Sequence, residues 1–213
     1  MADMIEKCKY ADKYKAVYVG HRQHLRLRRC RFESYLGGQM KVLGITGHRP
    51  KKLYGYDEES PGNVFVIHAM GDFFKEHKPE KVITGMALGT DQWAAQWCIK
   101  LEIPFIAAIP TEGQENMWPE KSQKKYRWIL ECAAETVVVT PKVYGEPLAP
   151  TLSLIMQKRN EWIVDHSDSM LAVFGGYAGG TRNCLEYAKE KGKEIAIINP
   201  GDYYRNNKYD LWR

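Results

Sequence analysis

Residues 81–101 read KVITGMALGTDQWAAQWCIKL, and this stretch decides the predicted fold. Lys81–Thr84 is a short β-rich run, and a loop with two glycines follows it. Thr90–Leu101 then has helical periodicity, with Trp93, Trp97 and Leu101 on one face of the helix. A strand, a glycine loop and an amphipathic helix in this order predict one unit of an α/β fold.

The same alternation continues in both directions along the chain. The other candidate strands are Lys41–Thr46, Phe105–Ile109, Thr136–Val139, Met170–Phe174 and Glu194–Ile198. The other candidate helices are Asn63–His77, Pro119–Cys132, Leu152–Asp165 and Thr181–Lys191. The strands are nearly all apolar rather than alternating, which is typical of strands buried on both faces. The sequence therefore predicts an α/β, Rossmann-like, doubly wound and mainly parallel sheet of about six strands with helices on both faces.

The 213 residues suit one domain with a full core, and the charge is unevenly distributed. Residues 1–39 hold nine Lys and Arg against four Asp and Glu, whereas residues 40–213 hold 22 of each. We therefore predict a basic N-terminal extension over 1–39, a Rossmann-like domain over 40–200 and a C-terminal tail over 201–213. The domain itself carries no overall field that would attract nucleic acid.

Three interpretations of the extension stay open. It is a flexible or weakly helical segment, or a nucleic-acid-binding arm, or a zinc site. The arm would use Arg26, Arg28, Arg29 and Arg31. The zinc site would use Cys8, His21, His24 and Cys30, whose spacing matches no standard pattern, so no metal is predicted.

The sequence also predicts where the protein works. No apolar run approaches the roughly 18 residues of a membrane span, so no membrane partner is expected. Five scattered cysteines with no CxxC pair fit a reducing compartment, and we expect a cytoplasmic protein.

Ligands of open parallel sheets bind beyond the carboxyl ends of the strands, so the residues that follow each strand are the site candidates. At the end of the first strand these are Thr46, Gly47, His48 and Arg49. Gly47 permits a tight turn, and the Arg49 guanidinium suits a phosphate or a carboxylate. The alternative is a surface turn with solvated side chains.

The loop of the opening stretch supplies a second group of candidates: Gly85, Met86, Ala87, Gly89, Thr90 and Asp91. A glycine-spaced loop that opens a helix exposes N–H groups, and the helix dipole adds to their attraction for an anion. The loop matches neither the GK[ST] ending of a P-loop nor GxGxxG. The alternative for Thr90 and Asp91 is to cap the helix.

The richest glycine segment is Gly175–Asn183, which has four glycines in six residues. It lies between a buried strand and a helix, and glycine lets the backbone approach a ligand closely. We predict that this loop contacts a phosphate or a ribose. The residues expected to do so are Gly176, Gly179, Gly180, Thr181 and Asn183, with a helix cap as the alternative for Thr181.

Two further candidates lie elsewhere. Gln114 belongs to the polar loop after the third strand and can contact a base or ribose edge, with Trp118 as a stacking ring. Arg159 lies inside the apolar stripe of helix Leu152–Asp165, and a buried arginine needs a partner. A protein carboxylate, Asp165 or Asp168 for instance, is favoured over an anionic ligand.

Together these segments resemble the SLOG superfamily, and within it the YpsA-like group of Gram-positive bacteria and phages. The resemblance covers about residues 40–200. It rests on ITGHRP (45–50), TGMALGTD (84–91), GQE (113–115), Arg159-Asn160 and GGT (179–181). It implies nucleotide or nucleotide-derived ligands, for example an ADP-ribose or NAD derivative, bound by a sensor or sequestering protein. It also implies a homo-oligomer. No cofactor is predicted.

Enzymatic activity is left open. The resemblance extends to the Lonely-guy phosphoribohydrolases, whose PGGxGTxxE signature places a glutamate three residues after the threonine. Cys184 stands at that position here. Cleavage of an N-glycosidic bond needs a carboxylate, for which Asp91 and Glu115 are the candidates. Binding therefore ranks above hydrolysis of nucleoside monophosphates. Nucleic-acid binding through the basic residues 1–39 is the third hypothesis. The resemblance extends separately to the DprA lineage, which binds single-stranded DNA.

Overall fold

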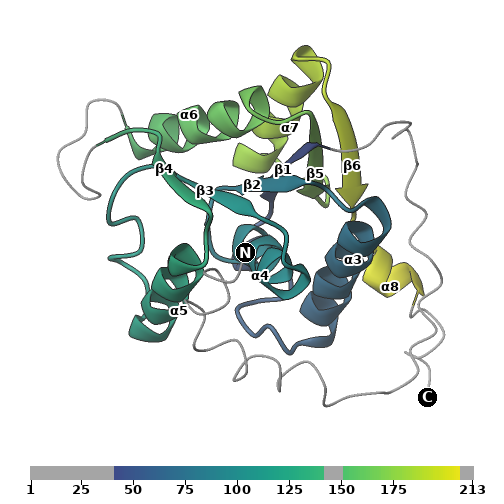
Figure 1. The fold of residues 1–213 in the computed structure, drawn as a ribbon. Coiled ribbons are helices and arrows are strands. Elements are labelled where there is room, and N and C mark those ends of the chain that lie inside the picture. Colours follow the sequence, from purple (N-terminus) through teal and green to yellow (C-terminus); the bar gives the residue numbers. More distant parts are fainter. Residues whose placement is uncertain (1–40, 142–150, 207–213) are drawn as a thin grey trace.

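The computed structural model describes residues 41–141 and 151–206. Six parallel strands form one sheet in the order β4-β3-β2-β1-β5-β6 (Figure 1). The strands are β1 (Val42–Gly47), β2 (Lys81–Thr84), β3 (Phe105–Ile109), β4 (Glu135–Val138), β5 (Ser169–Val173) and β6 (Glu194–Ile198). The helices are η1 (Pro50–Lys52), α3 (Pro61–His77), α4 (Thr90–Leu101), α5 (Glu120–Glu131), α6 (Leu152–Asp165), α7 (Gly180–Glu190) and α8 (Asp202–Asn206). The predicted fold class is confirmed.

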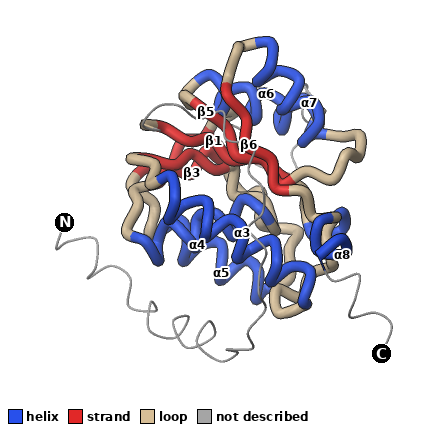
Figure 2. Tube along the Cα trace, turned by 90° about the vertical axis from the view of Figure 1, so that its right-hand side faces the viewer, coloured by secondary structure: helices blue, strands red, loops and turns tan. Residues whose placement is uncertain are grey.

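Helices cover both faces of the sheet, with α3, α4, α5 and α8 on one side and α6 and α7 on the other (Figure 2). The chain builds outward from β1 to β4 and then returns to place β5 on the other side of β1. The strand order reverses between β1 and β5, so the loops after these two strands leave for opposite faces. Such a switch point is where open α/β sheets bind their ligands.

Helix packing under the sheet depends on one small residue. A Cβ on Gly71 of α3 would lie 2.2 Å from the Trp97 ring of α4, so only glycine leaves room for this indole. The Trp97 Nε1–H donates to the Ile67 carbonyl at 2.7 Å, which satisfies the buried indole nitrogen. The apolar face predicted for α4 is confirmed, since Trp93 and Trp97 are buried and Leu101 packs against the same core.

The prediction that strands are buried on both faces holds for the four central strands and fails at the two edges. Glu135 and Thr136 of β4 are exposed, and Ile197 of β6 is 47% exposed. An edge strand has a neighbour on one side only, and so it keeps part of its surface in water.

The two ends of the chain were predicted separately from the domain. Residues 1–39, with the basic run and the zinc alternative, lie outside the described residues, as does the tail from residue 207. Residues 202–206 form α8. The Tyr203 ring lies 5.4 Å from that of Tyr54 and 6.0 Å from that of Phe65, so this helix packs on the domain beside α3.

Candidate functional site

The side chain of His48 joins the two loops of the switch point. It is almost fully buried at the end of β1. Its Nε2 accepts the Gly175 N–H at 3.0 Å, and its Nδ1 lies 3.5 Å from the Thr181 hydroxyl. Because an N–H donates to Nε2, that nitrogen carries no proton and the neutral ring is protonated at Nδ1. His48 thus fastens the loop after β5 to the end of β1.

This arrangement predicts a pH dependence of stability. Burial, followed by the positive charge of Lys52, lowers the pKa of His48 in the folded chain. Below about pH 6.5 the unfolded chain binds a proton that the folded chain does not, so the free energy of unfolding falls as the pH falls. We expect His48→Gln to make the fall between about pH 7.5 and about pH 5.5 shallower, as measured by urea unfolding.

Burial lowers the pKa of His68 as well, so the variant retains part of the pH dependence. Equal slopes for the variant and the unchanged chain would rule out His48 as a contributing group.

The β5–α7 loop presents bare backbone beside a lysine. Gly176 and Gly179 have φ values of +90° and +133°, which favour glycine. Helix α7 begins at Gly180 after the N-cap Gly179, and no side chain caps it. Thr181 therefore lies within the first turn, where its hydroxyl faces His48, and Asn183 is exposed. The ammonium of Lys52 donates to the Ala178 carbonyl at 2.5 Å. The sequence interpretation missed Lys52, although Lys51 and Lys52 directly follow the GHRP segment.

The β2–α4 loop is held together from inside. Met86 is fully buried and has a φ of +60°, which is unusual for a residue with a side chain. The Asp91 carboxylate accepts the Ala87 N–H at 3.2 Å, and the Asp91 carbonyl accepts the Thr84 hydroxyl at 2.8 Å. The N-cap of α4 is Gly89, and no side chain caps this helix either. Capping by Thr90 or Asp91 is therefore wrong.

Thr90 instead contacts the first loop. Its hydroxyl donates to the His48 carbonyl at 3.0 Å. A Cβ on Gly47 would lie 2.5 Å from the Thr90 methyl group, so Gly47 lets α4 approach the end of β1. The loops after β1 and β2 are in direct contact as a result.

Arg159 of α6 forms a buried ion pair with Asp91. Its Nη1 lies 3.0 Å from Asp91 Oδ2, and the two side chains are 7% and 6% exposed. The prediction that Arg159 pairs with a protein carboxylate is correct, but the suggested partners, Asp165 and Asp168, are wrong. Asp165 instead contacts Tyr187 and Lys191, and Asp168 accepts the Val42 N–H at 2.9 Å.

The direction of α6 explains the difference. This helix starts at the carboxyl edge of the sheet and ends at the amino edge, because it joins β4 to β5. Side chains on a helix lean toward its N-terminus, so Arg159 reaches the loops at the carboxyl edge. Asp165 and Asp168 follow at the opposite edge. The guanidinium also lies against Gly85, where a Cβ would be 1.2 Å from Nη1.

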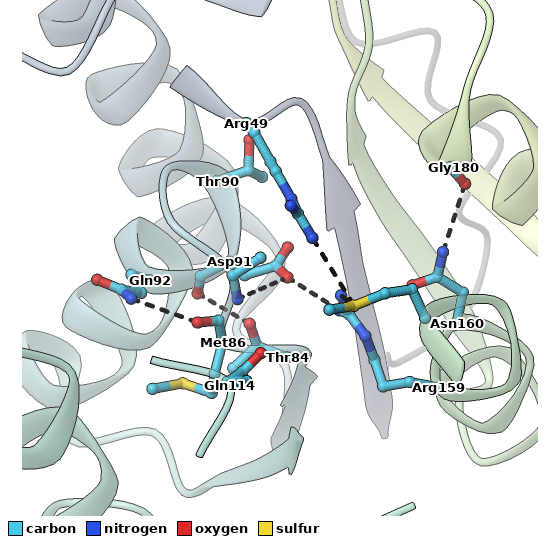
Figure 3. Close-up of polar contacts among 12 residues, drawn as sticks. Arg49, Thr84, Met86, Thr90, Asp91, Gln92, Gln114, Arg159, Asn160 and Gly180 are labelled. Atoms are coloured by element: carbon cyan, nitrogen blue, oxygen red, sulfur yellow. Dashed lines mark hydrogen bonds and ion pairs between the residues drawn. The ribbon is translucent and has the colours of Figure 1, made fainter. Parts of the chain in front are cut away.

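Two guanidinium groups approach one thioether. Arg49 Nη2 lies 3.7 Å from the Met156 sulfur, and Arg159 Nη2 lies 4.0 Å from the same atom (Figure 3). Arg49 is exposed and makes no ion pair with any residue of 41–141 or 151–206. The Arg159 Nε is buried without a hydrogen-bond partner among these residues. The neighbouring Asn160 amide donates to the Gly180 carbonyl at 3.4 Å, which joins α6 to the start of α7.

The loop after β3 points its polar groups inward. Gln114 is 2% exposed, and its amide donates to the Tyr126 hydroxyl at 2.9 Å. Burial raises the pKa of Tyr126 to about 12, so its hydroxyl stays protonated. Glu115 lies 3.6 Å from Arg127, and the Trp118 ring packs edge-on against Tyr126 at 5.3 Å. The two carboxylates considered for catalysis, Asp91 and Glu115, are thus both ion-paired.

Cys184 lies in the position of the hydrolase glutamate, and its surroundings are apolar. The thiol is buried in a cluster with Ile83, Ile163 and Met170 and hydrogen-bonds to Thr46. Burial raises its pKa to about 11, so it carries no negative charge near neutral pH. The group is neither a carboxylate nor a reactive thiolate.

The β1–α3 loop is fixed by two residues that the sequence interpretation missed. The buried Asn63 amide donates to the carbonyls of Gly55 and Asp57 at 2.9 and 2.7 Å, and its oxygen accepts the Tyr54 N–H at 3.4 Å. Glu58 accepts from the Trp93 indole at 2.8 Å and forms an ion pair with Lys125 at 2.6 Å. The signal in the sequence that could have indicated this role was Asn63 itself, a polar residue at the start of an otherwise apolar helix.

Comparison with known families decides the relationship of this chain. The model of the YspA SLOG family matches residues 43–202, which include the six strands apart from Val42, the first residue of β1, and the loops described above. The chain belongs to the YspA SLOG family. It is 41% identical over 138 residues to the SPbeta prophage-derived protein YoqJ of Bacillus subtilis strain 168, covering 59% of this chain and 80% of YoqJ. It is 28% identical over 163 residues to a UPF0398 protein of Bacillus cereus strain G9842, covering 72% of this chain and 85% of that protein.

Similar solved structures have low sequence identity to this chain. DNA processing protein A (DprA) of Helicobacter pylori, from a study of its single-stranded DNA binding mode, superimposes with a TM-score of 0.51 at 14% identity. The match covers 79% of this chain and 73% of that one. The molybdenum cofactor binding protein of Rippkaea orientalis gives a TM-score of 0.47 at 16% identity over 80% of this chain and 83% of its own.

Two further features of the described residues bear on partners. None of their helices is long and apolar enough to cross a membrane. Nor do they bring three or more His, Cys, Asp or Glu side chains together as a metal site.

Proposed function

We propose that this SLOG protein binds a nucleotide or nucleotide-derived molecule, such as an ADP-ribose or NAD derivative, as a sensor or sequestering protein. One observation carries the proposal. At the switch point, the uncapped N-terminus of α7 follows a loop with four glycines, and Lys52 lies beside that loop. Free N–H groups at a helix start, the helix dipole and a lysine all favour a phosphate.

The same loop suits a ligand by its shape. A Cβ on Gly176 would meet no atom within 4 Å, and one on Gly180 would come only within 3.8 Å of Asn160 Nδ2. Packing therefore requires glycine at neither position. The φ of +90° accounts for Gly176, whereas Gly180 has no such backbone requirement, and close approach of a ligand to the backbone would account for it. The exposed ring of Tyr177 lies on this loop, where it offers a stacking surface for a base.

The contacts of the acidic candidates favour binding over hydrolysis. Asp91 is occupied by Arg159 and the Ala87 N–H, and Glu115 is held near Arg127. The protonated thiol of Cys184 replaces the glutamate of the related hydrolases. A carboxylate free to stabilise an oxocarbenium-like centre is not found among these three groups.

The proposal is tested by thermal unfolding with a panel of nucleotides, preceded by mass spectrometry of small molecules that copurify with the chain. A ligand at about 100 times its Kd should add about 2.7 kcal/mol to the free energy of unfolding and raise the Tm. We expect Gly180→Val to abolish this rise, because its branched side chain would occupy the space in front of the α7 N-terminus.

Gly180→Ala is the matched control, since a single Cβ fits without a clash. It should fold normally and keep most of the rise in Tm. A rise that survives Gly180→Val unchanged would place the ligand elsewhere, and no rise with any nucleotide would refute the proposal.

A further inference from the structure

The cluster of Arg49, Met156 and Arg159 has an excess of donors over acceptors. A thioether is a weak hydrogen-bond acceptor, yet it is what both guanidinium groups contact at this point. Because both lie against one sulfur, the two Nη2 atoms are no more than about 8 Å apart. The usual partner of an arginine side chain is a carboxylate or a phosphate, because either group accepts two N–H groups at once.

The charge of this cluster is not balanced among the described residues. Asp91 neutralises Arg159, whereas Arg49 has the sulfur of Met156 as its partner. The Nε of Arg159 is also left without a hydrogen-bond partner among the described residues, although Arg159 is only 6% exposed. An unpaired buried donor costs free energy, so the cluster is suited to an acceptor that arrives from outside.

This cluster adjoins the loop to which the first anionic group is assigned above. Asn160 follows Arg159 directly and donates to the Gly180 carbonyl at 3.4 Å, at the first residue of α7. Figure 3 shows the side chains of Arg49 and Arg159 pointing toward one another, with the hydrogen bond between Asn160 and Gly180 to their right. One molecule with two neighbouring anionic groups can therefore reach both places.

We infer that the ligand carries a diphosphate. One phosphate lies on the β5–α7 loop, and the second is held between Arg49 and Arg159 beside the Met156 sulfur. This inference rests on the proposed function and narrows it to nucleoside diphosphates and their derivatives. A monophosphate would occupy the glycine loop and leave the two arginines as they are.

The first test compares ADP with AMP, and inorganic pyrophosphate with inorganic phosphate, by isothermal titration calorimetry on the full chain. We expect the diphosphate of each pair to bind at least about tenfold more tightly. Arg49 is exposed, so Arg49→Gln should fold normally, and it should weaken the binding of ADP more than that of AMP and so reduce the preference. Equal affinities for ADP and AMP would overturn the inference and leave the proposed function standing; binding of neither would overturn both.

The second test places a carboxylate of the protein itself between Arg49 and Arg159. Met156→Glu places a carboxylate where the sulfur lies, so it should raise the Tm of the ligand-free chain and remove the preference for ADP. Met156→Gln is the matched control, because glutamine has the shape of glutamate without its charge. This variant should keep the preference for ADP over AMP. If Met156→Glu lowers the Tm and ADP is still preferred, the two arginines do not hold the second phosphate.

Discussion

Gly85→Ala is expected to lower the free energy of unfolding by about 3 kcal/mol or more, although it adds a single methyl group. The added Cβ would lie 1.2 Å from Arg159 Nη1 and 2.2 Å from its Cζ. The guanidinium would have to withdraw, and the Asp91 carboxylate would then remain buried without its counter-charge. Urea unfolding followed by circular dichroism measures the loss.

Two variants separate this steric effect from other consequences of losing a glycine. Gly180→Ala adds the same group where the nearest atom is 3.8 Å away, and it should change stability by less than about 0.5 kcal/mol. In an Arg159→Met background, Gly85→Ala should cost far less than it does alone, because the guanidinium is gone. The same cost in both backgrounds would contradict the assigned clash.

Arg159→Met is expected to cost about 3–5 kcal/mol, because a buried ion pair that loses one partner leaves an uncompensated charge. Adding Asp91→Asn should recover most of the loss, since the amide oxygen still accepts the Ala87 N–H and carries no charge. The double-mutant cycle, measured by the same unfolding assay, should show a large coupling. Losses that simply add would mean that the pair contributes little and that Arg159 acts through its packing alone.

Most of the fold was predictable from local pattern. The bounds of β2, β3, β6, α4 and α6 agree with the predicted ranges, and those of β1, β4, β5, α3, α5 and α7 differ by one or two residues. The short helices η1 and α8 were not predicted. Apolar runs and amphipathic periodicity indicate which residues are buried, and the strands and helices of this fold are both defined by their buried faces. The glycine loops were predictable for a related reason, since they lie at fixed places between a strand and a helix.

The partners of the polar side chains were not predictable. Arg159 pairs with Asp91, which lies 68 residues earlier, and the nearer acids Asp165 and Asp168 lie at the other edge of the sheet. Local sequence shows that a buried arginine needs a partner, but the strand order decides which carboxylate comes within reach. Lys52 is a similar case, because its contact with Ala178 spans the switch point.

The loop from Leu53 to Ser60 has a thermodynamic consequence. Asn63 holds its backbone with three hydrogen bonds, and Glu58 ties it to α4 and α5. Ordering a backbone costs about 1–2 kcal/mol of conformational entropy per residue. For these residues that entropy is lost when the chain folds, because their hydrogen bonds need no partner from outside. The loop from Leu53 to Ser60 is therefore already ordered in the folded chain, and binding of a ligand would not have to supply the free energy of ordering it.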